Sequence, residues 1–254
     1  MCMKIGIIGG SGLDDPDIIK DLQSQTWTTP YGETTVKSGR LNGVDIVFVP
    51  RHGDRHQFSP THVNYRANIQ TLKDLKTSHI IATNACGSLK EEIERSDFII
   101  PNQFIDFTRR RINTFHDDFS QGMFHEVMAD PFDKSISDLL FRVTGDLGLR
   151  VHKDKTLVTI EGPRFSTRAE SKMYIAWGAD IINMTVATEA ALAKEAGIPY
   201  AVIAMSTDYD CWKEDEEMPV WQEILAIEPA HKLKIDQNKL QNCRSNILNL
   251  VNVL

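Results

Sequence analysis

Residues 181–212 decide the fold, and they read IINMTVATEAALAKEAGIPYAVIAMSTDYDCW. Two apolar runs rich in Ile, Val and Ala flank a helical segment in this stretch, which is the order of a βαβ unit. The first run ends in residues 183–185, NMT, and the second in a pair of aspartates, Asp208 and Asp210. We therefore expect both polar clusters at the carboxyl ends of neighbouring parallel strands, where open α/β sheets bind ligands.

The spacing of Asp208 and Asp210 suits recognition of a purine. Two carboxyl groups one residue apart on a loop can accept hydrogen bonds from an exocyclic amino group. A protonated carboxyl can also donate to a ring nitrogen. The pair is thus a candidate for reading a purine and for assisting its chemistry.

Strand-like runs alternate with helical patterns along the rest of the chain. This alternation predicts an α/β protein with a mixed, largely parallel central sheet and helices on both faces. No linker or repeat divides the sequence, so residues 1–254 are expected to form a single domain. Strands are expected at Lys4–Ile8, Asp45–Val49, His79–Thr83, Phe98–Ile100, Thr156–Ile160, Ala179–Ile182 and Ala201–Met205. Helices are expected at Val63–Leu75, Lys134–Leu147, Thr167–Trp177, Glu189–Ala196 and from Ala230 onward.

Composition narrows the class of protein. A formal net charge of -7 argues against broad binding to nucleic acid or to an anionic membrane. The chain has no stretch approaching the roughly 20 apolar residues of a membrane span, and its start is too briefly apolar for a signal peptide. Cys2, Cys86, Cys211 and Cys243 are scattered and form no C-x-x-C pair, which favours a reduced, cytoplasmic chain.

Two loops that follow strand-like runs carry groups suited to phosphate. Residues 6–13, GIIGGSGL, let backbone N–H groups approach an anion, and Ser11 adds a hydroxyl; a purely structural glycine turn is the alternative. In the second loop Arg51 offers a planar fork of donors, and His52 adds another. Metal binding by His52 and His56 is the weaker alternative there, since no carboxylate-rich cluster accompanies them, and a solvated charged loop is the other.

Two more loops contribute groups suited to a small ligand. Residues 83–88, TNACGS, permit close approach of a sugar or phosphate, although such residues also make simple turns. Cys86 lies there without an evident His or Asp partner, which favours a buried thiol over a nucleophile. Residues 159–170, TIEGPRFSTRAE, end in the pattern of a helix capping box. Phe165 precedes that helix, where its ring can stack on a base or pack in the core.

Residues 159–170, 183–185 and 207–212 together resemble the trimeric purine nucleoside phosphorylase family, in its 5'-methylthioadenosine phosphorylase branch. The resemblance extends from Gly6 to about Glu217. It implies reversible phosphorolysis, in which inorganic phosphate attacks the ribose anomeric carbon of 5'-methylthioadenosine. The products would be adenine and 5-methylthioribose 1-phosphate. This reaction of purine and methionine salvage requires no metal or organic cofactor.

The same resemblance implies a role for each motif residue. One set would bind phosphate, another the nucleoside, and one histidine would come from a neighbouring subunit. The phosphate set is Ser11, Arg51, His52 and Thr185, with Asn84 and Ala85 on the same side. The nucleoside set is Met184 beneath the ribose, Phe165, Asn183, Asp208 and Asp210 around the adenine, and His56 and the neighbour's His125 near the 5'-substituent. A shared site of this kind implies a homotrimer, while pairing of trimers into a hexamer stays open.

Glycosidic cleavage builds positive charge on the ribose and negative charge on the leaving purine. Phosphate oxygens stabilise the first charge, and a proton or hydrogen bond at N7 relieves the second. We expect Asp208 to donate to N7, with Asp210 supporting it and the 6-amino group. Donation at neutral pH requires the pKa of Asp208 to rise above ~4, which burial beside a second carboxyl favours.

Three positions depart from the family's pattern. Asn84 stands where the branch commonly has Thr, Thr188 lies in a run that is usually Val-Pro-Glu, and Trp221 replaces a small aliphatic residue near the 5'-pocket. A broader purine nucleoside phosphorylase acting on adenosine or inosine is therefore the alternative enzyme. A catalytically silent nucleoside-binding protein is the alternative from another class, but mere binding requires no second, phosphate-sized anion site.

Overall fold

The computed structural model describes residues 4–10, 20–120 and 122–213 of the chain. Strands and helices alternate along these residues. The strands are β1 Lys4–Gly9, β2 Lys20–Thr29, β3 Gly32–Leu41, β4 Val44–Pro50, β5 His79–Ser88, β6 Phe98–Phe107, β7 Val151–Ile160, β8 Ile181–Asn183 and β9 Tyr200–Asp208. The helices are α1 Tyr65–Asp74, α2 Lys134–Asp146, α3 Arg168–Ala176 and α4 Val186–Glu195, with 3-10 helices at Pro60–His62 and Asp210–Trp212.

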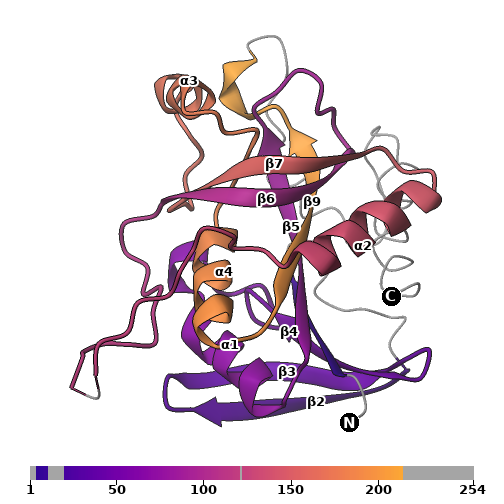
Figure 1. Ribbon diagram of the computed structural model, residues 1–254, viewed down its shortest axis with the longest axis vertical. Coiled ribbons are helices and arrows are strands. Elements are labelled where there is room, and N and C mark those ends of the chain that lie inside the picture. The colour runs from indigo at the N-terminus through magenta and orange to yellow at the C-terminus, as the bar shows by residue number, and fades with distance from the viewer. Residues whose placement is uncertain (1–3, 11–19, 121, 214–254) are drawn as a thin grey trace.

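The strands form one mixed sheet in the order β2-β3-β4-β1-β5-β8-β7-β6-β9. Because β9 also pairs with β5, the strands β5, β8, β7, β6 and β9 close into a ring, from which β1 to β4 extend as an open sheet (Figure 1). β1 is parallel to both of its neighbours, β4 and β5, and β7 is parallel to β6 and β8. The outer strands β2 and β3 are antiparallel.

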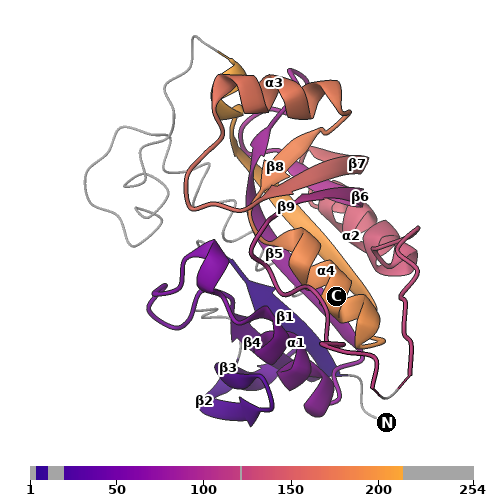
Figure 2. The same cartoon turned by 90° about the vertical axis from the view of Figure 1, so that its left-hand side faces the viewer.

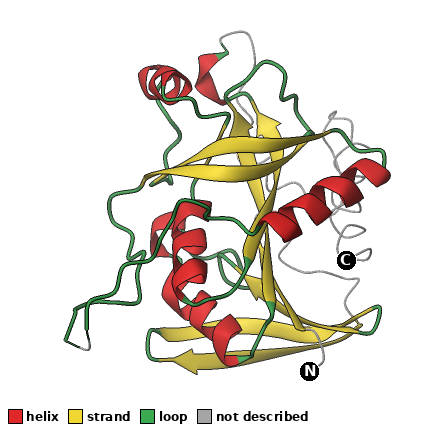
Figure 3. Ribbon diagram, viewed as in Figure 1, coloured by secondary structure: helices red, strands yellow, loops and turns green. Residues whose placement is uncertain are grey.

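Helices cover both faces of this sheet, as the sequence predicts. Successive residues of a strand point to opposite faces, so Ile8 and Val202 belong to one core and Ile7 and Ile203 to another. Residues of α1 and α4 complete the first core, and residues of α2 complete the second, on the other side of β5 and β9 (Figure 3). α3 lies at the end of the molecule opposite to β2 and β3 (Figure 2).

The two strands that carry the polar clusters are not parallel neighbours, so that prediction is wrong. β5 pairs with both of them, antiparallel to β8 and parallel to β9. The clusters nevertheless meet, because Ile182 and Asp208 both pair with Gly87 near the carboxyl end of β5. Strand order along the chain does not reveal which strand comes between two others in a closed ring, and this is the physical reason for the error.

Other differences follow from local chemistry. β2 and β3 were not predicted because their sequences are polar, and β3 buries mainly Val36 and Leu41. α4 begins at Val186, three residues before the predicted start, and the helix predicted from Ala230 lies outside the described residues. The predicted capping box of α3 is confirmed at Thr167 and Glu170. No helix of the described part of the chain is long and apolar enough to cross a membrane.

Candidate functional site

A cavity of about 370 Å³ lies where the carboxyl ends of β5, β8 and β9 approach the loop that follows β4. This volume is in the range of small-molecule sites. The cavity brings together most of the residues that the sequence singled out. Those in its wall are Arg51, His52, His56, Asn84, Ala85, Phe165, Asn183, Met184, Thr185, Asp208 and Asp210. The wall also contains residues to which the sequence analysis gave no role, among them Phe58, Ser59, Pro60, Pro163 and Ser166.

Of the other two predicted residues, one lies outside the described part of the chain and the other lies away from the cavity. Ser11 lies outside the described residues. His125 is exposed in the segment between β6 and α2, where its ring meets Phe119 edge to face, with the ring centroids 5.5 Å apart. In a single copy of the chain, His125 is therefore not part of the site.

One end of the cavity contains a fixed cation, Arg51. Its Nε and Nη2 donate to the two carboxylate oxygens of Glu189 at 2.5 and 3.0 Å, and Nη1 donates to the carbonyl oxygen of Thr83 at 2.9 Å. The side chains of Arg51 and Glu189 are both only 1% exposed. Burial opposes the charge of Arg51, but the carboxylate outweighs that effect and raises the pKa of the guanidinium. Arg51 is thus a permanent charge in a fixed orientation.

Further polar groups surround this end. His52 Nδ1 lies 2.7 Å from the carbonyl oxygen of Phe58, and because a carbonyl only accepts, Nδ1 carries the hydrogen. Asn84 donates from Nδ2 to the hydroxyl of Thr185 at 2.9 Å, and Thr185 is the N-cap residue immediately before α4. A helix N-terminus together with an arginine favours an anion. This end of the cavity is therefore suited to phosphate.

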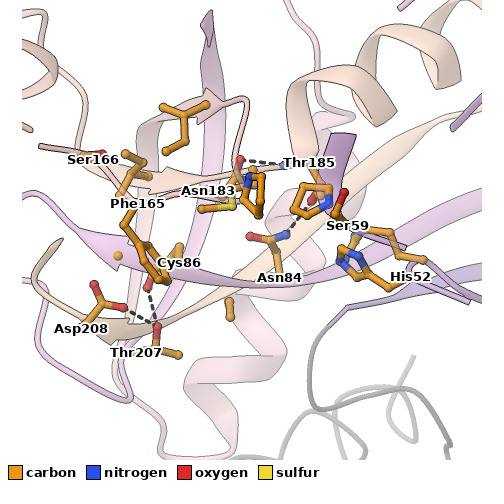
Figure 4. Close-up of a pocket in the computed structure, with 18 of the residues that line it drawn as sticks. His52, Ser59, Asn84, Cys86, Phe165, Ser166, Asn183, Thr185, Thr207 and Asp208 are labelled. Atoms are coloured by element: carbon orange, nitrogen blue, oxygen red, sulfur yellow. Dashed lines mark hydrogen bonds between the residues drawn. The ribbon is translucent and has the colours of Figure 1, made fainter. Parts of the chain in front are cut away.

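Both aspartates belong to the cavity wall, and Figure 4 shows Asp208 at the end away from His52. Asp208 accepts from the main-chain N–H of Asp210 and from the hydroxyl of Thr207, both at 2.8 Å. Burial and the neighbouring charge of Asp208 raise the pKa of Asp210. The two carboxyls are therefore not equivalent.

Gly87 makes room for this arrangement. A Cβ at position 87 would lie 2.9 Å from both Asp208 Oδ1 and Ile182 Cγ2, closer than side chains pack. Asp210 itself has a φ of 49°, in the left-handed region that non-glycine residues seldom adopt. Backbone in this region is found where a site requires a particular side-chain direction. The ends of β5 and β9 are thus shaped to hold the carboxyl pair.

Several buried polar atoms of the cavity wall lack a hydrogen-bond partner among the described residues. They are Asn84 Oδ1, Asn183 Nδ2, Ser166 Oγ and Asp210 Oδ2. Buried polar groups are nearly always satisfied, so unpartnered donors and acceptors around one cavity indicate a polar ligand. Both donors and acceptors are present, which suits a heterocycle with both kinds of group.

The structure bears on two alternative roles, a nucleophile at Cys86 and a metal site at His52 and His56. The thiol of Cys86 is buried, and its burial next to Asp208 raises its pKa well above the usual value, which disfavours a nucleophilic thiolate. His52 and His56 stack with ring centroids 4.5 Å apart. Within the described residues, no three His, Cys, Asp or Glu side chains are grouped so that they could hold a metal ion.

Fold and site together define a class of protein. A model of the phosphorylase superfamily matches residues 4–235, and the chain belongs to this superfamily. Its relatives specify the branch. The chain is 51% identical over 220 residues to S-methyl-5'-thioadenosine phosphorylase of Danio rerio, covering 85% of this chain and 79% of that protein. The enzyme of the same name from Anopheles gambiae is 48% identical over 237 residues, covering 92% and 85%.

Solved structures indicate the same branch of the superfamily. Methylthioadenosine phosphorylase from Schistosoma mansoni in complex with adenine superposes with a TM-score of 0.87 at 39% identity, covering 99% of this chain and 91% of that chain. A variant of the adenosine/methylthioadenosine phosphorylase from that organism, in complex with methylthioadenosine, gives 0.86 at 38% identity with the same coverage. The predicted α/β phosphorylase fold and the predicted family are confirmed.

Proposed function

We propose that this protein catalyses the reversible phosphorolysis of 5'-methylthioadenosine to adenine and 5-methylthioribose 1-phosphate. The observation that carries the proposal is the polarity of the cavity, which has a fixed cation at one end and a carboxyl pair at the other. Phosphate and purine would occupy opposite ends, with the ribose between them. Relatives that bear the name of this activity support the same assignment.

Phosphate binds at the end formed by Arg51, His52 and Thr185. Asn84 and Ala85 lie along the same wall, and Ser11 completes the set in this proposal. Arg51 donates from its remaining N–H groups, and the N-terminus of α4 adds its partial positive charge. A phosphate held there directs an oxygen at the anomeric carbon and stabilises the positive charge that develops on the ribose.

The nucleoside occupies the rest of the cavity. Phe165 is 40% exposed, so one part of its ring is available to stack on the base. Met184 lies beneath the ribose, Asn183 offers its unpartnered amide N–H₂ to the adenine, and His56 approaches the 5'-substituent. These contacts orient the glycosidic bond toward the phosphate.

Asp208 and Asp210 act as a pair that carries one proton. Asp208 makes the hydrogen bond to N7, and Asp210 supports it at the 6-amino group. The raised pKa of Asp210 favours a proton on its carboxyl, and transfer of this proton to Asp208 allows Asp208 to donate it to N7. Moving this proton toward N7 as the glycosidic bond breaks neutralises the charge on the leaving adenine.

Assembly into a homotrimer completes the site. The segment between β6 and α2 exposes four large apolar side chains, Ile112, Phe119, Met123 and Val127, with exposed fractions of 54%, 49%, 78% and 70%. Exposed apolar groups at this density mark an interface. Docking this segment on a neighbour would bury them and bring His125 to the neighbour's 5'-pocket. Trimers that pair into hexamers would leave this arrangement intact.

Three further assignments follow from the proposal. Residues 1–254 form a single phosphorylase domain. Catalysis requires inorganic phosphate as a co-substrate and no resident metal or organic cofactor, because the carboxyl pair and the phosphate stabilise both developing charges. The net charge of -7 and the scattered cysteines suit a cytoplasmic enzyme that binds neither nucleic acid nor membrane.

Release of adenine from 5'-methylthioadenosine, measured with and without inorganic phosphate, tests the proposal. We expect release only with phosphate, together with formation of a pentose 1-phosphate. Adenine release without phosphate would make the protein a hydrolase, and binding without release would make it a silent nucleoside-binding protein. Parallel assays with adenosine and inosine decide whether the substrate range is broader than 5'-methylthioadenosine.

A further inference from the structure

A second buried arginine, Arg111, connects several segments beside the cavity. It is not in the cavity wall, and its side chain is only 1% exposed. Its Nε donates to Glu161 Oε1 at 2.8 Å, and its Nη2 donates to the carbonyl oxygens of Glu161 and Met184 at 2.6 and 3.1 Å. Its Nη1 donates to the hydroxyl of Tyr65. One guanidinium thus joins segments more than 70 residues apart.

Glu161 holds this guanidinium in place. Its Oε2 accepts from the main-chain N–H groups of Arg109 and Arg110 at 2.6 and 2.9 Å, and its Oε1 accepts from the hydroxyl of Thr61 at 2.9 Å. Burial works against ionisation, but these hydrogen bonds and that of Arg111 outweigh it and lower the pKa of Glu161 to about 2. The carboxylate is therefore charged at neutral pH and fully engaged.

Met184 is the point at which this network reaches the cavity. Its carbonyl accepts from Arg111, while its side chain packs over Gly162, where a Cβ would lie 2.5 Å from the Met184 sulfur. Gly162 follows Glu161 and has a φ of 65°. The same short turn therefore sets both the backbone and the side chain of the residue that lies beneath the ribose.

We propose that Arg111, held by Glu161, is a positioning residue for the nucleoside, and that it acts by fixing Met184. The inference rests on the proposed function for the identity of the ligand. Arg111 itself touches no substrate. Its effect should fall on the nucleoside and not on phosphate, because the phosphate end has its own arginine and carboxylate, Arg51 and Glu189.

The substitution Arg111→Lys tests the inference. A lysine keeps the charge but cannot reach Glu161, Met184 and Tyr65 together, since it lacks the planar fork of donors. We expect both the dissociation constant and the KM for the nucleoside to rise about tenfold, as for the loss of a hydrogen bond to a charged group. The KM for phosphate should change less than about twofold. Equal changes in both Michaelis constants, or none, would overturn the inference.

Arg164→Lys is the matched control. Arg164 also forms a two-point pair with a glutamate, Glu170, and lies in the loop that contains Glu161, but its side chain is 67% exposed. We expect this substitution to leave both Michaelis constants within about twofold, because exposed pairs contribute little. A tenfold rise in nucleoside KM here would show that any disturbance of the loop has that effect, and would remove the special role of Arg111.

A double-mutant cycle with Met184→Ala tests whether Arg111 acts through Met184. If Arg111 acts through Met184, the effect of Arg111→Lys on nucleoside binding should shrink to less than about threefold once Met184 is truncated. An undiminished tenfold effect would contradict this route. If Arg111→Lys does not fold, as judged by circular dichroism, Glu161→Gln enters the cycle with the same expected outcomes.

Failure of the inference is distinguishable from failure of the proposed function. Calorimetric titration of unmodified protein and variants with 5'-methylthioadenosine measures the positioning effect directly, without any reaction. Unmodified protein that binds the nucleoside but releases no adenine with phosphate would overturn the proposed function alone. Full activity with unchanged binding in Arg111→Lys would overturn the inference alone.

Discussion

The two arginine–glutamate pairs beside the cavity have different architectures. Glu189 accepts from side chains, those of Arg51 and Tyr200, and both members of the Arg51 pair are 1% exposed. The carboxylate of Glu161 accepts from two backbone N–H groups as well as from two side chains, and its partner Arg111 also donates to backbone carbonyls. The side chain of Glu161 is 21% exposed.

The two ion pairs share the same arginine–carboxylate chemistry but use it in different ways. The Arg51 pair presents a charge of fixed orientation to the cavity and makes one backbone contact, at the carbonyl oxygen of Thr83. The Arg111 pair fixes the backbone and presents no charge to the cavity. Breaking the first pair should therefore affect phosphate and global stability, whereas disturbing the second should affect the shape of the nucleoside wall.

The largest effect is expected for Arg51→Met. Loss of a two-point, charge-assisted contact should lower kcat/KM for phosphate by ~10²-fold or more. It should also destabilise the protein by about 3–5 kcal/mol, because Glu189 becomes a buried, unpaired charge. Phosphate-varied kinetics and urea unfolding measure the two effects.

Adding Glu189→Leu to Arg51→Met separates the effect on phosphate use from the effect on stability. Replacing both members of a buried pair with apolar residues is often close to neutral for stability. We expect the free energy of unfolding to return most of the way to that of the unmodified protein, while kcat/KM for phosphate stays low. Recovery of phosphate use in the double variant would mean that Arg51 serves only the fold, and the two pairs would then be alike.

Asp208→Asn sharpens the comparison at the purine end. The amide can still donate to N7 and can turn its NH₂ group toward a 6-oxo substituent. Activity on 5'-methylthioadenosine should fall ~10²-fold, while the ratio of inosine to adenosine cleavage should rise. This ratio of kcat/KM values cancels nonspecific damage. An unchanged ratio would show that Asp208 does not read the purine.

His125→Ala tests the part of the site that a single copy of the chain lacks. We expect the KM for the nucleoside to rise roughly fivefold, equivalent to about 1 kcal/mol, with the KM for phosphate and the mass of the assembly unchanged. Kinetics combined with light scattering provides both readouts. Fully active protein with a monomer mass would contradict the shared site.

The smallest effect concerns acid stability. The pKa of Glu161 is about 2 in the fold, below its ordinary value of 4.5. Its ionisation therefore stabilises the fold above about pH 4.5, and this contribution is lost as the pH falls toward 2. Glu161→Gln should lower the melting temperature by about 2–4 °C at pH 7, and by less near pH 3.

Glu91→Gln is the control for this measurement, since Glu91 forms an exposed pair with Lys213. We expect that substitution to change the melting temperature little at either pH. If Glu161→Gln lowers the melting temperature equally at pH 7 and pH 3, the charge of the Glu161 carboxylate is not what stabilises the loops.

Much of this site could be predicted from the sequence, because its groups lie in short motifs at strand ends. Asn183 and Thr185 are two residues apart, as are Asp208 and Asp210, and each pair ends an apolar run. Arg51 and His52 are adjacent after another such run. Residues close in sequence at a strand end stay close in space, so these motifs predicted both the family and the cavity wall.

The residues that hold this wall were not predictable from local patterns. Glu189 is 138 positions from Arg51, and Glu161 is 50 positions from Arg111. On its own, each reads as an ordinary charged residue on a helix or a loop. Their pairing depends on which segments the closed ring of strands brings together.

By itself the sequence determined the local elements, since apolar periodicity, glycine turns and the capping box act over a few residues. It thereby determined the α/β class and, through its motifs, the family. Only the tertiary structure decided that β5 separates β8 from β9, that Asp208 and Asp210 differ in their surroundings, and that the two arginines have separate tasks. Burial and partner choice between distant segments set these properties, because desolvation and hydrogen-bond geometry are fixed only when the whole chain has folded.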